Sequence, residues 1–345
     1  MTEECHSLRF IEIGAYEREE SMTKWKRYAL VLVGIILMIL ILIGSFIYTT
    51  RYVGTDSIDV HNGGAMANKS NFDIIENVDN KVTMNNTNKE EQITIEPEMS
   101  IVQVDLSHIF DEVNGCFVLY NKETTEYSIY NQTLAETRVS PYSTFKLVAT
   151  LMGLRNSVVV DENSTMDYNG TIYPVDSWNQ NVNLKDAFQT SCIWYFRQII
   201  DAVGQQEVQS ELNKLSYGNC DISEWSGSGL NPGEELNGFW LASSLKISPL
   251  EQVQVLQKAL GEESIYSEHE VDIMKGVMLH DEVNGYSIYG KTGTNQNKEG
   301  WYVGVAEKEQ HTYYFAVYII SDDATQLATG NMAREIVKKK FANEN

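Results

Sequence analysis

The chain has 345 residues, of which 43% are hydrophobic and 10% aromatic, so it can hold one large globular domain with appendages. Its formal net charge of -22 at pH 7 argues against nucleic acid as a partner, because binding to phosphates depends on clustered Lys and Arg. The same composition excludes a low-complexity protein.

The first predicted element is a membrane-spanning helix. Lys24, Lys26 and Arg27 precede a run of about 21 uncharged residues, a length that crosses a bilayer. Because basic residues stay on the cytoplasmic side, we expect 1–27 to be a short cytoplasmic segment and 28–49 a transmembrane signal anchor. A cleaved signal peptide is the alternative, and the bulky residues that end the run argue against cleavage. Met22 is an alternative start.

Residues 50–100 are rich in Asn and charge and have no periodicity, which predicts an extracellular disordered tether. Beyond it, "CFVLYNKETTEYSIYN" and "WYVGVAEKEQHTYYFAVYII" each predict a β-hairpin, and "NMAREIVKKKF" predicts a closing helix. We therefore expect 101–345 to be an α+β domain, in which an antiparallel sheet from both ends of the domain is flanked by helices and a mainly helical subdomain is inserted between the hairpins. The protein would be a single-pass protein of the cell membrane with this domain outside the cell.

The cysteines and histidines predict no metal site. Cys116, Cys192 and Cys220 are widely spaced, and no CxxC motif occurs. In "HEVDI", Ile273 stands where the HExxH motif of zinc peptidases needs its second histidine. We expect Cys116 and Cys192 to be ordinary small hydrophobes, and we expect no disulfide.

The stretch "SPYSTFKLVATLMGL" places a lysine in a helix that is apolar around most of its circumference. Lys146 lies three residues after Ser143, which on a helix puts both side chains on one face, about 5–6 Å apart at Cβ. A buried lysine tends to lose its charge, and a neutral amine is a base or a nucleophile.

A serine and a lysine three residues apart occur by chance in many proteins, so the motifs that follow decide whether this pair indicates a catalytic site. Ser191 opens the apolar helix of "SCIWYF", "YGN" follows at Tyr217 to Asn219, and "YGKTGT" places Lys291 on a strand before the second hairpin. This order is typical of the penicillin-recognising acyl-serine enzymes.

The motifs "SPYSTFKL", Ser-Cys-Ile at 191–193, "YGNCDIS", "FWLASSLKISPLEQV" and "KTGT" followed by "GWYVG" resemble the class D (OXA-type) β-lactamases and the related sensor domain of β-lactam receptors. The resemblance covers about 103–343. It implies the serine β-lactamase and DD-peptidase fold, β-lactam antibiotics as ligands, and Ser143 as the nucleophile that forms an acyl-enzyme.

For Lys146 the resemblance implies N6-carboxylysine, a carbamate made from carbon dioxide, which would act as general base with no other cofactor. Only a neutral amine attacks carbon dioxide, so an apolar pocket is what this chemistry requires. Trp240 would hold the carbamate through its indole N–H, against the simpler interpretation of core packing, and Ile193 would shield it.

The resemblance also implies roles for the remaining motifs. Ser191 would relay a proton to the lactam nitrogen, and Lys291 would supply positive charge. The backbone N–H groups of Ser143 and Thr294 would form the oxyanion hole. The substrate-binding set is completed by Ile193, Thr292, Gly293, Tyr217 and Asn219, of which Tyr217 and Asn219 are interpreted as mainly structural.

The sequence departs from the family at the substrate carboxylate. Many class D enzymes bind it with an arginine about 45 residues beyond the KTG motif, where this chain has "SDDATQLATG". Arg334 is predicted to lie on the following helix, so the carboxylate would fall to Thr292, Thr294 and Thr329.

Three functions share the acylation step. We favour a membrane-tethered serine β-lactamase. A β-lactam sensor with a long-lived acyl-enzyme is the alternative. Receptors of this kind are multi-span proteins with a cytoplasmic zinc peptidase, whereas this chain has one predicted span and a short cytoplasmic segment. They also tend to carry Asn where this chain has Ile193. A peptidoglycan transpeptidase or carboxypeptidase is the third. The substrate spectrum and a homodimer stay open.

Overall fold

The computed structural model describes residues 99–227, 237–323 and 325–344. The predicted cytoplasmic segment, membrane helix and nearly all of the tether lie outside them, as does Met22. Within these three ranges no helix combines the length and the apolar character needed to cross a bilayer.

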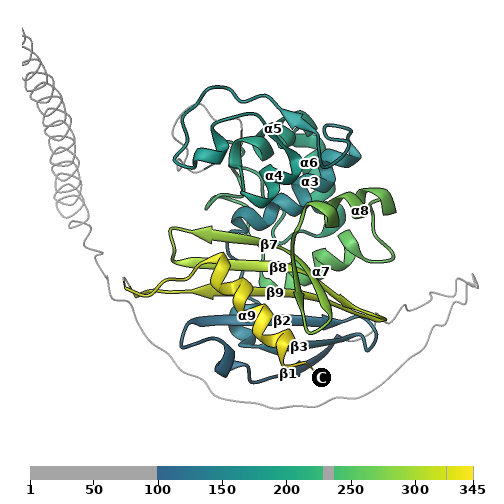
Figure 1. Cartoon of the computed structure of the whole chain (residues 1–345), viewed down its shortest axis with the longest axis vertical. Helices are drawn as coiled ribbons and strands as arrows, with labels where there is room; N and C mark the ends of the chain where they lie inside the picture. The colour runs from purple at the N-terminus through teal and green to yellow at the C-terminus, as the bar shows by residue number, and fades with distance from the viewer. Residues whose placement is uncertain (1–98, 228–236, 324, 345) are drawn as a thin grey trace, which may run out of the picture. The chain divides into compact units, whose positions relative to one another are not determined.

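Seven strands form one sheet in the order β1-β3-β2-β9-β8-β7-β6 (Figure 1). The two ends of the domain meet at its centre, where β2 pairs with β9. All neighbours are antiparallel except β1 and β3, which differs from the antiparallel sheet that the sequence predicts. The chain reverses direction between β1 and β2, and it reverses again in the hairpin from β2 to β3. Strands β1 and β3 therefore run in the same direction, and they pair in parallel. The strands are β1 (Ser100–Gln103), β2 (Asn114–Asn121), β3 (Glu126–Tyr130), β6 (Leu279–Val283), β7 (Tyr286–Asn295), β8 (Glu299–Lys308) and β9 (His311–Ile320).

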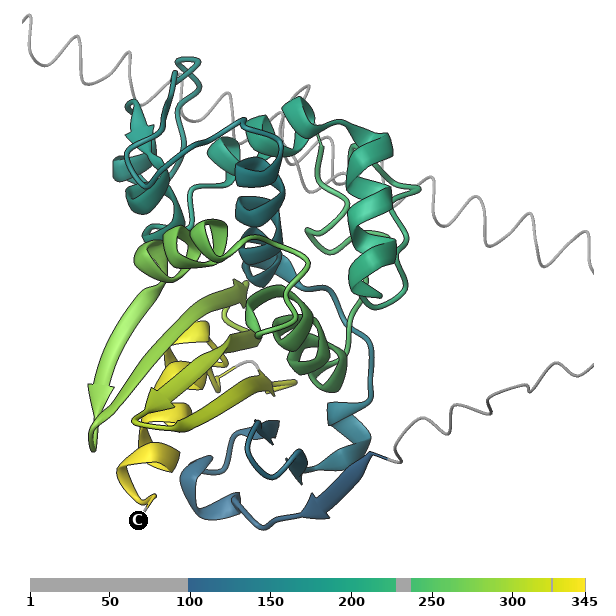
Figure 2. The same ribbon diagram turned by 90° about the vertical axis from the view of Figure 1, so that its right-hand side faces the viewer.

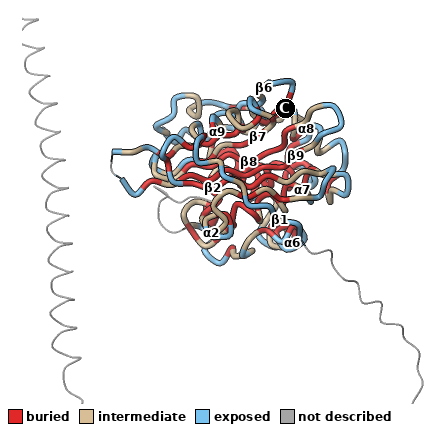
Figure 3. The backbone as a smooth tube through the Cα atoms, turned by 90° about the horizontal axis from the view of Figure 1, so that it is seen from below, coloured by how far each residue is buried: buried red, intermediate tan, exposed pale blue. Residues whose placement is uncertain are grey.

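Both predicted hairpins are confirmed, and their alternating side chains build two apolar layers. Phe117 and Leu119 of β2 belong to the core shared with α9, whereas Cys116 and Val118 belong to the larger core shared with the other helices. This is the period of two expected for a sheet buried on both faces. Figure 3 shows buried residues following the central strands β2, β8 and β9.

Helices cover both faces of the sheet. The predicted C-terminal helix is present as α9 and packs on β7, β8 and β9, while α7 packs on β2, β8 and β9 from the other side (Figures 1 and 2). Ser248 and Glu251 form a capping box at the start of α7, with Pro249 in its first turn. The helices are α2 (Gln132–Ala135), α3 (Phe145–Arg155), α4 (Leu184–Gln189), α5 (Ile193–Val203), α6 (Gln205–Leu215), α7 (Pro249–Leu260), α8 (Glu268–Val277) and α9 (Gly330–Ala342).

The inserted subdomain is mainly helical, as predicted, and contains α3, α4, α5 and α6 (Figure 1). Its only sheet among the described residues is the short pair β4 (Thr165–Met166) and β5 (Val182–Asn183). Three 3-10 turns complete the described elements: η1 (Ser107–Ile109), η2 (Tyr142–Thr144) and η3 (Asp176–Trp178).

Helix α3 is buried around its whole circumference. Every residue from Phe145 to Leu154 is buried, including Lys146, and the helix follows directly on the 3-10 turn η2. A helix without a polar face lies in the interior of a protein. The turn and the helix together carry the predicted Ser143 and Lys146 pair into the centre of the domain.

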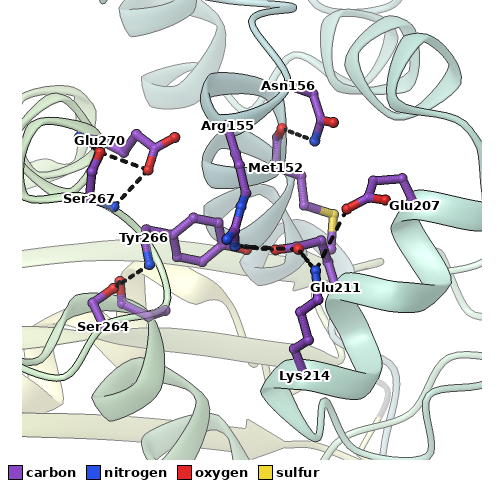
Figure 4. Close-up of polar contacts among 11 residues, drawn as sticks. Met152, Arg155, Asn156, Glu207, Glu211, Lys214, Ser264, Tyr266, Ser267 and Glu270 are labelled. Atoms are coloured by element: carbon purple, nitrogen blue, oxygen red, sulfur yellow. Dashed lines mark hydrogen bonds and ion pairs between the residues drawn. The ribbon is translucent and has the colours of Figure 1, made fainter.

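At the far end of α3 a buried carboxylate links α3 to α6 beside the Tyr266 ring (Figure 4). The Glu211 side chain on α6 is fully buried. Its carboxylate oxygens lie 3.2 Å from a guanidinium nitrogen of Arg155, at the end of α3, and 2.7 Å from Lys214 Nζ. The Arg155 guanidinium also lies 5.4 Å from the ring of Tyr266. Burial alone raises the pKa of Glu211, but the hydrogen bond from Lys214 and the positive charges of Arg155 and Lys214 outweigh it and hold the pKa below its ordinary value. The carboxylate therefore stays charged and ties α3 to α6.

We predict that Glu211→Gln lowers the free energy of unfolding by about 1–3 kcal/mol, because Arg155 and Lys214 lose the charged acceptor that Glu211 offers at a buried position. The control is Glu207→Gln on the same helix, since Glu207 is partly exposed and lies 3.8 Å from the same Lys214. An exposed pair of this kind contributes about 0–1 kcal/mol. Urea unfolding of both variants measures the difference.

The pH dependence has a defined sign. Because folding lowers the pKa of Glu211, its contribution is complete above the ordinary value of 4.5 and is lost as the pH falls through the lower folded value. The stability gap between wild type and Glu211→Gln should close on acidification, and a gap that persisted would contradict the ion-pair explanation.

Candidate active site

Ser143 and Lys146 lie in direct contact. Turn η2 presents Ser143, and the first turn of α3 presents Lys146, whose Nζ donates a hydrogen bond of 2.7 Å to Ser143 Oγ. Lys146 is fully buried, and its Nζ lies 5.7 Å from the centre of the Phe196 ring. A base in hydrogen-bond contact with a hydroxyl is the arrangement that activates a serine nucleophile.

A second serine and a second lysine complete the polar group. Ser191 stands just before α5, and its Oγ is 3.5 Å from Lys146 Nζ and 2.9 Å from Lys291 Nζ. Lys291 comes from β7 and is fully buried. Ser191 therefore bridges the two amines. The structure brings together four residues that the sequence spreads over 149 positions, from 143 to 291.

Both amines are easier to deprotonate than ordinary lysines. Burial, and after it the positive charge of Lys291, holds the pKa of Lys146 well below its ordinary value. Burial lowers the pKa of Lys291 to about 7. A proton on one amine disfavours a proton on the other, so near neutral pH the pair can supply one base and one acid. Burial raises the pKa of the neighbouring Cys192 to about 11, so that thiol stays neutral.

Trp240 has an unused buried donor. Its side chain is fully buried and stacks on Phe145 with ring centres 5.1 Å apart. Its indole N–H has no hydrogen-bond partner among the described residues. Buried polar groups are rarely left unpaired, so this N–H is available to an acceptor that the unmodified polypeptide does not provide. Ile193 is half-buried at the first position of α5, two residues after Ser191.

Hydrogen bonds to β8, to α7 and to the segment around Trp240 hold the nucleophile turn. The indole N–H of Trp301 on β8 donates to the carbonyl of Ser140 at 3.2 Å. The Gln252 amide on α7 donates to Thr144 Oγ1 at 2.8 Å, and the backbone N–H of Tyr142 donates to the carbonyl of Trp240. Such support from rigid elements holds a reactive side chain in place.

The free edge of β7 faces this group. The β6 pairing ends at Gly290, so residues beyond it have a strand on one side only. The Thr292 carbonyl accepts a hydrogen bond of 2.8 Å from Lys291 Nζ and so points to the free edge. Backbone groups of residues two apart in a strand point to the same edge, which puts the N–H of Thr294 there as well. A Cβ added to Gly293 would lie 3.5 Å from the Pro141 carbonyl, so β7 passes close under the nucleophile turn.

Tyr217 and Asn219 contact other parts of the protein. Tyr217 is fully buried with its ring edge-on to Phe145, and Asn219 exchanges hydrogen bonds with the backbone of Ser244 and Lys246. Gly218 between them has φ of 54°, and a Cβ there would lie 1.9 Å from the Lys246 carbonyl. Only glycine fits this conformation and approach. These contacts match a structural role better than contact with substrate.

The arginine nearest in sequence is committed elsewhere. Arg334 lies on α9, as predicted, and binds Asp281 of β6 through two nitrogens, at 2.6 and 2.9 Å. Thr294 Oγ1 accepts from the backbone N–H of Gly330, and Thr329 caps α9. Both hydroxyls keep a proton that they can donate.

The sequence did not point to Tyr142, Asn295 and Glu299, which form a hydrogen-bonded group beside the nucleophile. Tyr142 and Glu299 are 157 residues apart and belong to no shared motif. The one signal available for these residues was their closeness in sequence to Ser143 and to the KTG motif.

Known proteins resemble this chain in sequence and in fold. The model of the penicillin-binding protein transpeptidase domain matches residues 115–341. A probable β-lactamase, YbxI of Bacillus subtilis, is 34% identical over 246 residues, which cover 71% of this chain and 87% of that protein. The regulatory protein BlaR1 of Bacillus licheniformis is 33% identical over 246 residues, but these span only 39% of its length.

Solved structures that match this chain include the same two kinds of protein, a β-lactamase and a receptor domain. The chain matches a class D β-lactamase from Bacillus subtilis with a TM-score of 0.62 and 32% identity, covering 70% of this chain and 97% of that one. It matches the C-terminal domain of the Bacillus licheniformis BlaR penicillin receptor with a TM-score of 0.62 and 31% identity, covering 72% and 100%. The chain therefore belongs to the penicillin-binding protein transpeptidase family, alongside the class D β-lactamases and the BlaR-type receptor domains.

Proposed function

We propose that this protein is a membrane-tethered serine β-lactamase that hydrolyses β-lactams through an acyl-enzyme on Ser143. The observation that carries the proposal is the fully buried amine of Lys146, 2.7 Å from the Ser143 hydroxyl and with a lowered pKa. Resemblance to β-lactamases over most of their length supports it.

Each residue then has a defined part in the reaction. Ser143 Oγ attacks the lactam carbonyl and gives its proton to the base on Lys146, while the N–H groups of Ser143 and Thr294 stabilise the oxyanion. The lactam C–N bond breaks, and Ser191 passes a proton to the nitrogen with Lys291 as the source of positive charge. Thr292 and Thr294 hydrogen-bond the substrate carboxylate. Water then attacks the acyl carbon, loses its proton to the base, and releases the Ser143 hydroxyl.

We further propose that Lys146 carries a carbamate formed from carbon dioxide, which supplies an anionic general base. The residues present fit it, because a neutral amine is what reacts with carbon dioxide and the unpaired N–H of Trp240 suits a carbamate oxygen. The apolar side chain of Ile193 next to the site would keep water from the carbamate.

A β-lactam sensor is the second candidate. It is favoured by the match to the BlaR penicillin receptor domain, whose TM-score equals that of the β-lactamase. Both functions need acylation of Ser143, and they part at deacylation. The family model's transpeptidase description leaves a peptidoglycan enzyme as a third candidate.

Ser143→Ala should abolish covalent labelling by a fluorescent penicillin, because the variant has no nucleophile at this position. Gel fluorescence measures the label, and circular dichroism checks that the variant is folded. Label that persisted on a folded variant would place the nucleophile elsewhere.

Trp240→Phe should slow deacylation by at least about tenfold and acylation less, because it keeps the stacked ring and removes only the N–H that would hold the carbamate. Added bicarbonate should raise nitrocefin turnover of wild type at limiting carbon dioxide, and the variant should need more of it. Trp225→Phe is the control, since Trp225 also stacks on an aromatic ring, that of Phe239.

The same traces separate the two main candidates. A β-lactamase shows steady turnover after the first equivalent of nitrocefin, whereas a sensor stops after one stoichiometric burst and keeps its acyl group. A burst without a steady state would overturn the hydrolase and favour the sensor.

The membrane tether predicts that the full chain stays in the membrane pellet through a high-salt wash and enters solution with detergent. The reason is the apolar run at 28–49 with basic residues before it. Recovery in the medium of a chain that starts after about residue 50 would instead support a cleaved signal peptide.

A further inference from the structure

We propose that Glu299 is a positioning residue for acylation: its carboxylate fixes the separation between the backbone N–H groups of Ser143 and Thr294. The proposal rests on the proposed acyl transfer at Ser143, and adds the device that aligns the two halves of the oxyanion hole.

The Glu299 carboxylate collects three hydrogen bonds at the start of β8. Its Oε2 accepts from the Tyr142 hydroxyl and from the Asn295 amide, both at 2.6 Å. Its Oε1 accepts from the Tyr318 hydroxyl at 2.6 Å. The Asn295 amide also donates to the Tyr142 oxygen at 2.9 Å, so the Tyr142, Asn295 and Glu299 groups form a closed triangle.

The two residues held at Oε2 flank the two proposed oxyanion donors. Tyr142 immediately precedes Ser143, and Asn295 immediately follows Thr294. The Ser143 N–H belongs to the peptide plane that follows Tyr142, and the Thr294 N–H is joined to Asn295 through the Thr294 residue and the peptide plane that follows it. A single carboxylate oxygen therefore ties the nucleophile turn to the end of β7, and the distance between the donors depends on it.

Tyr142 requires an anchor because of its backbone. Its φ of 47° lies in the left-handed region, which residues with a bulky side chain rarely adopt. The contacts of its side chain hold it there, and its φ and ψ set the direction of the Ser143 peptide. Loss of the anchor would let the turn relax and rotate the Ser143 N–H away from the developing oxyanion.

The carboxylate is itself fixed to the core. Tyr318 on β9 is buried, and its ring centre lies 4.6 Å from that of Trp301, whose indole N–H binds the Ser140 carbonyl. Burial and the charge of Glu299 raise the pKa values of Tyr142 and Tyr318, so both phenols stay protonated and act as donors. The arrangement links the centre of the sheet to both sides of the reacting carbonyl.

The proposal predicts a specific kinetic defect. The oxyanion forms only as the carbonyl is attacked, so misaligned donors slow acylation without weakening the first encounter with substrate. Because removal of a whole donor costs on the order of 100-fold or more, we expect about tenfold slower acylation for Glu299→Gln, which keeps the shape but can accept at one atom only.

The test uses full-length protein and four variants: Glu299→Gln, Tyr142→Phe, their double mutant, and Glu307→Gln. Glu307 is the control because it also lies on β8 and its carboxylate is bound by Lys275 at 2.7 Å. Stopped-flow with nitrocefin separates the acylation rate constant from the binding constant. A phenylboronic acid, which forms a tetrahedral adduct with the serine, reports on the oxyanion hole, and thermal melts report on stability.

We expect both single variants to acylate about tenfold more slowly and to bind the boronate more weakly by a similar factor. Their binding constant for nitrocefin should stay within about twofold of wild type. Glu307→Gln should be unaffected in all three measurements. The double mutant should be no slower than the slower single variant, because both changes break the same hydrogen bond between Tyr142 and Glu299. Wild-type acylation and boronate binding in Glu299→Gln, or singles whose losses multiply in the double mutant, would overturn the proposal.

The outcomes also separate this proposal from the one it rests on. If wild type is acylated and the variants match it, only the positioning role fails. If wild type is not acylated at Ser143, the proposed function fails and the positioning role with it. If Glu299→Gln does not fold, the kinetics of Tyr142→Phe decide alone.

Discussion

The burial of Lys146 beside Ser143 is the constraint on which the rest of the domain depends. A charged ammonium in an apolar helix is costly, and the fold meets this cost by lowering the pKa of the amine. The fully buried helix and the charge of the second lysine both act in that direction. What would be a defect in an ordinary core is here the source of a base at neutral pH.

The arrangement of the helical subdomain against the sheet explains how such a site is held. The nucleophile turn lies between the helical subdomain and the sheet, and it is bound to β8 by Trp301 and to α7 by Gln252. Lys291 comes from β7 and Ser191 from just before α5, so the polar group draws on both the sheet and the helical subdomain. A site assembled in this way has little freedom to relax, which suits catalysis by preorganised groups.

Much of this was predictable, because motifs and hydrophobic patterns are local. The hairpins followed from paired apolar and aromatic runs about a polar turn, and Ser143, Lys146, Ser191 and Lys291 from the order of their motifs. The parallel pairing of β1 was not, since an edge strand of four residues gives no signal of its partner. Glu299 was also missed, because its contacts with Tyr142 exist only once β8 and η2 meet in space.

The pairing of β2 with β9 at the centre of the sheet has a consequence for biogenesis. Asn114 lies opposite Ile320, so β2 is synthesised early in the domain and its partner β9 late. The sheet cannot close until residue 320 has left the ribosome, and loop closure over such a separation is slow. Until then β2 and β3 lack the strand that pairs with them at the centre of the sheet, and their apolar faces expose the nascent domain to aggregation.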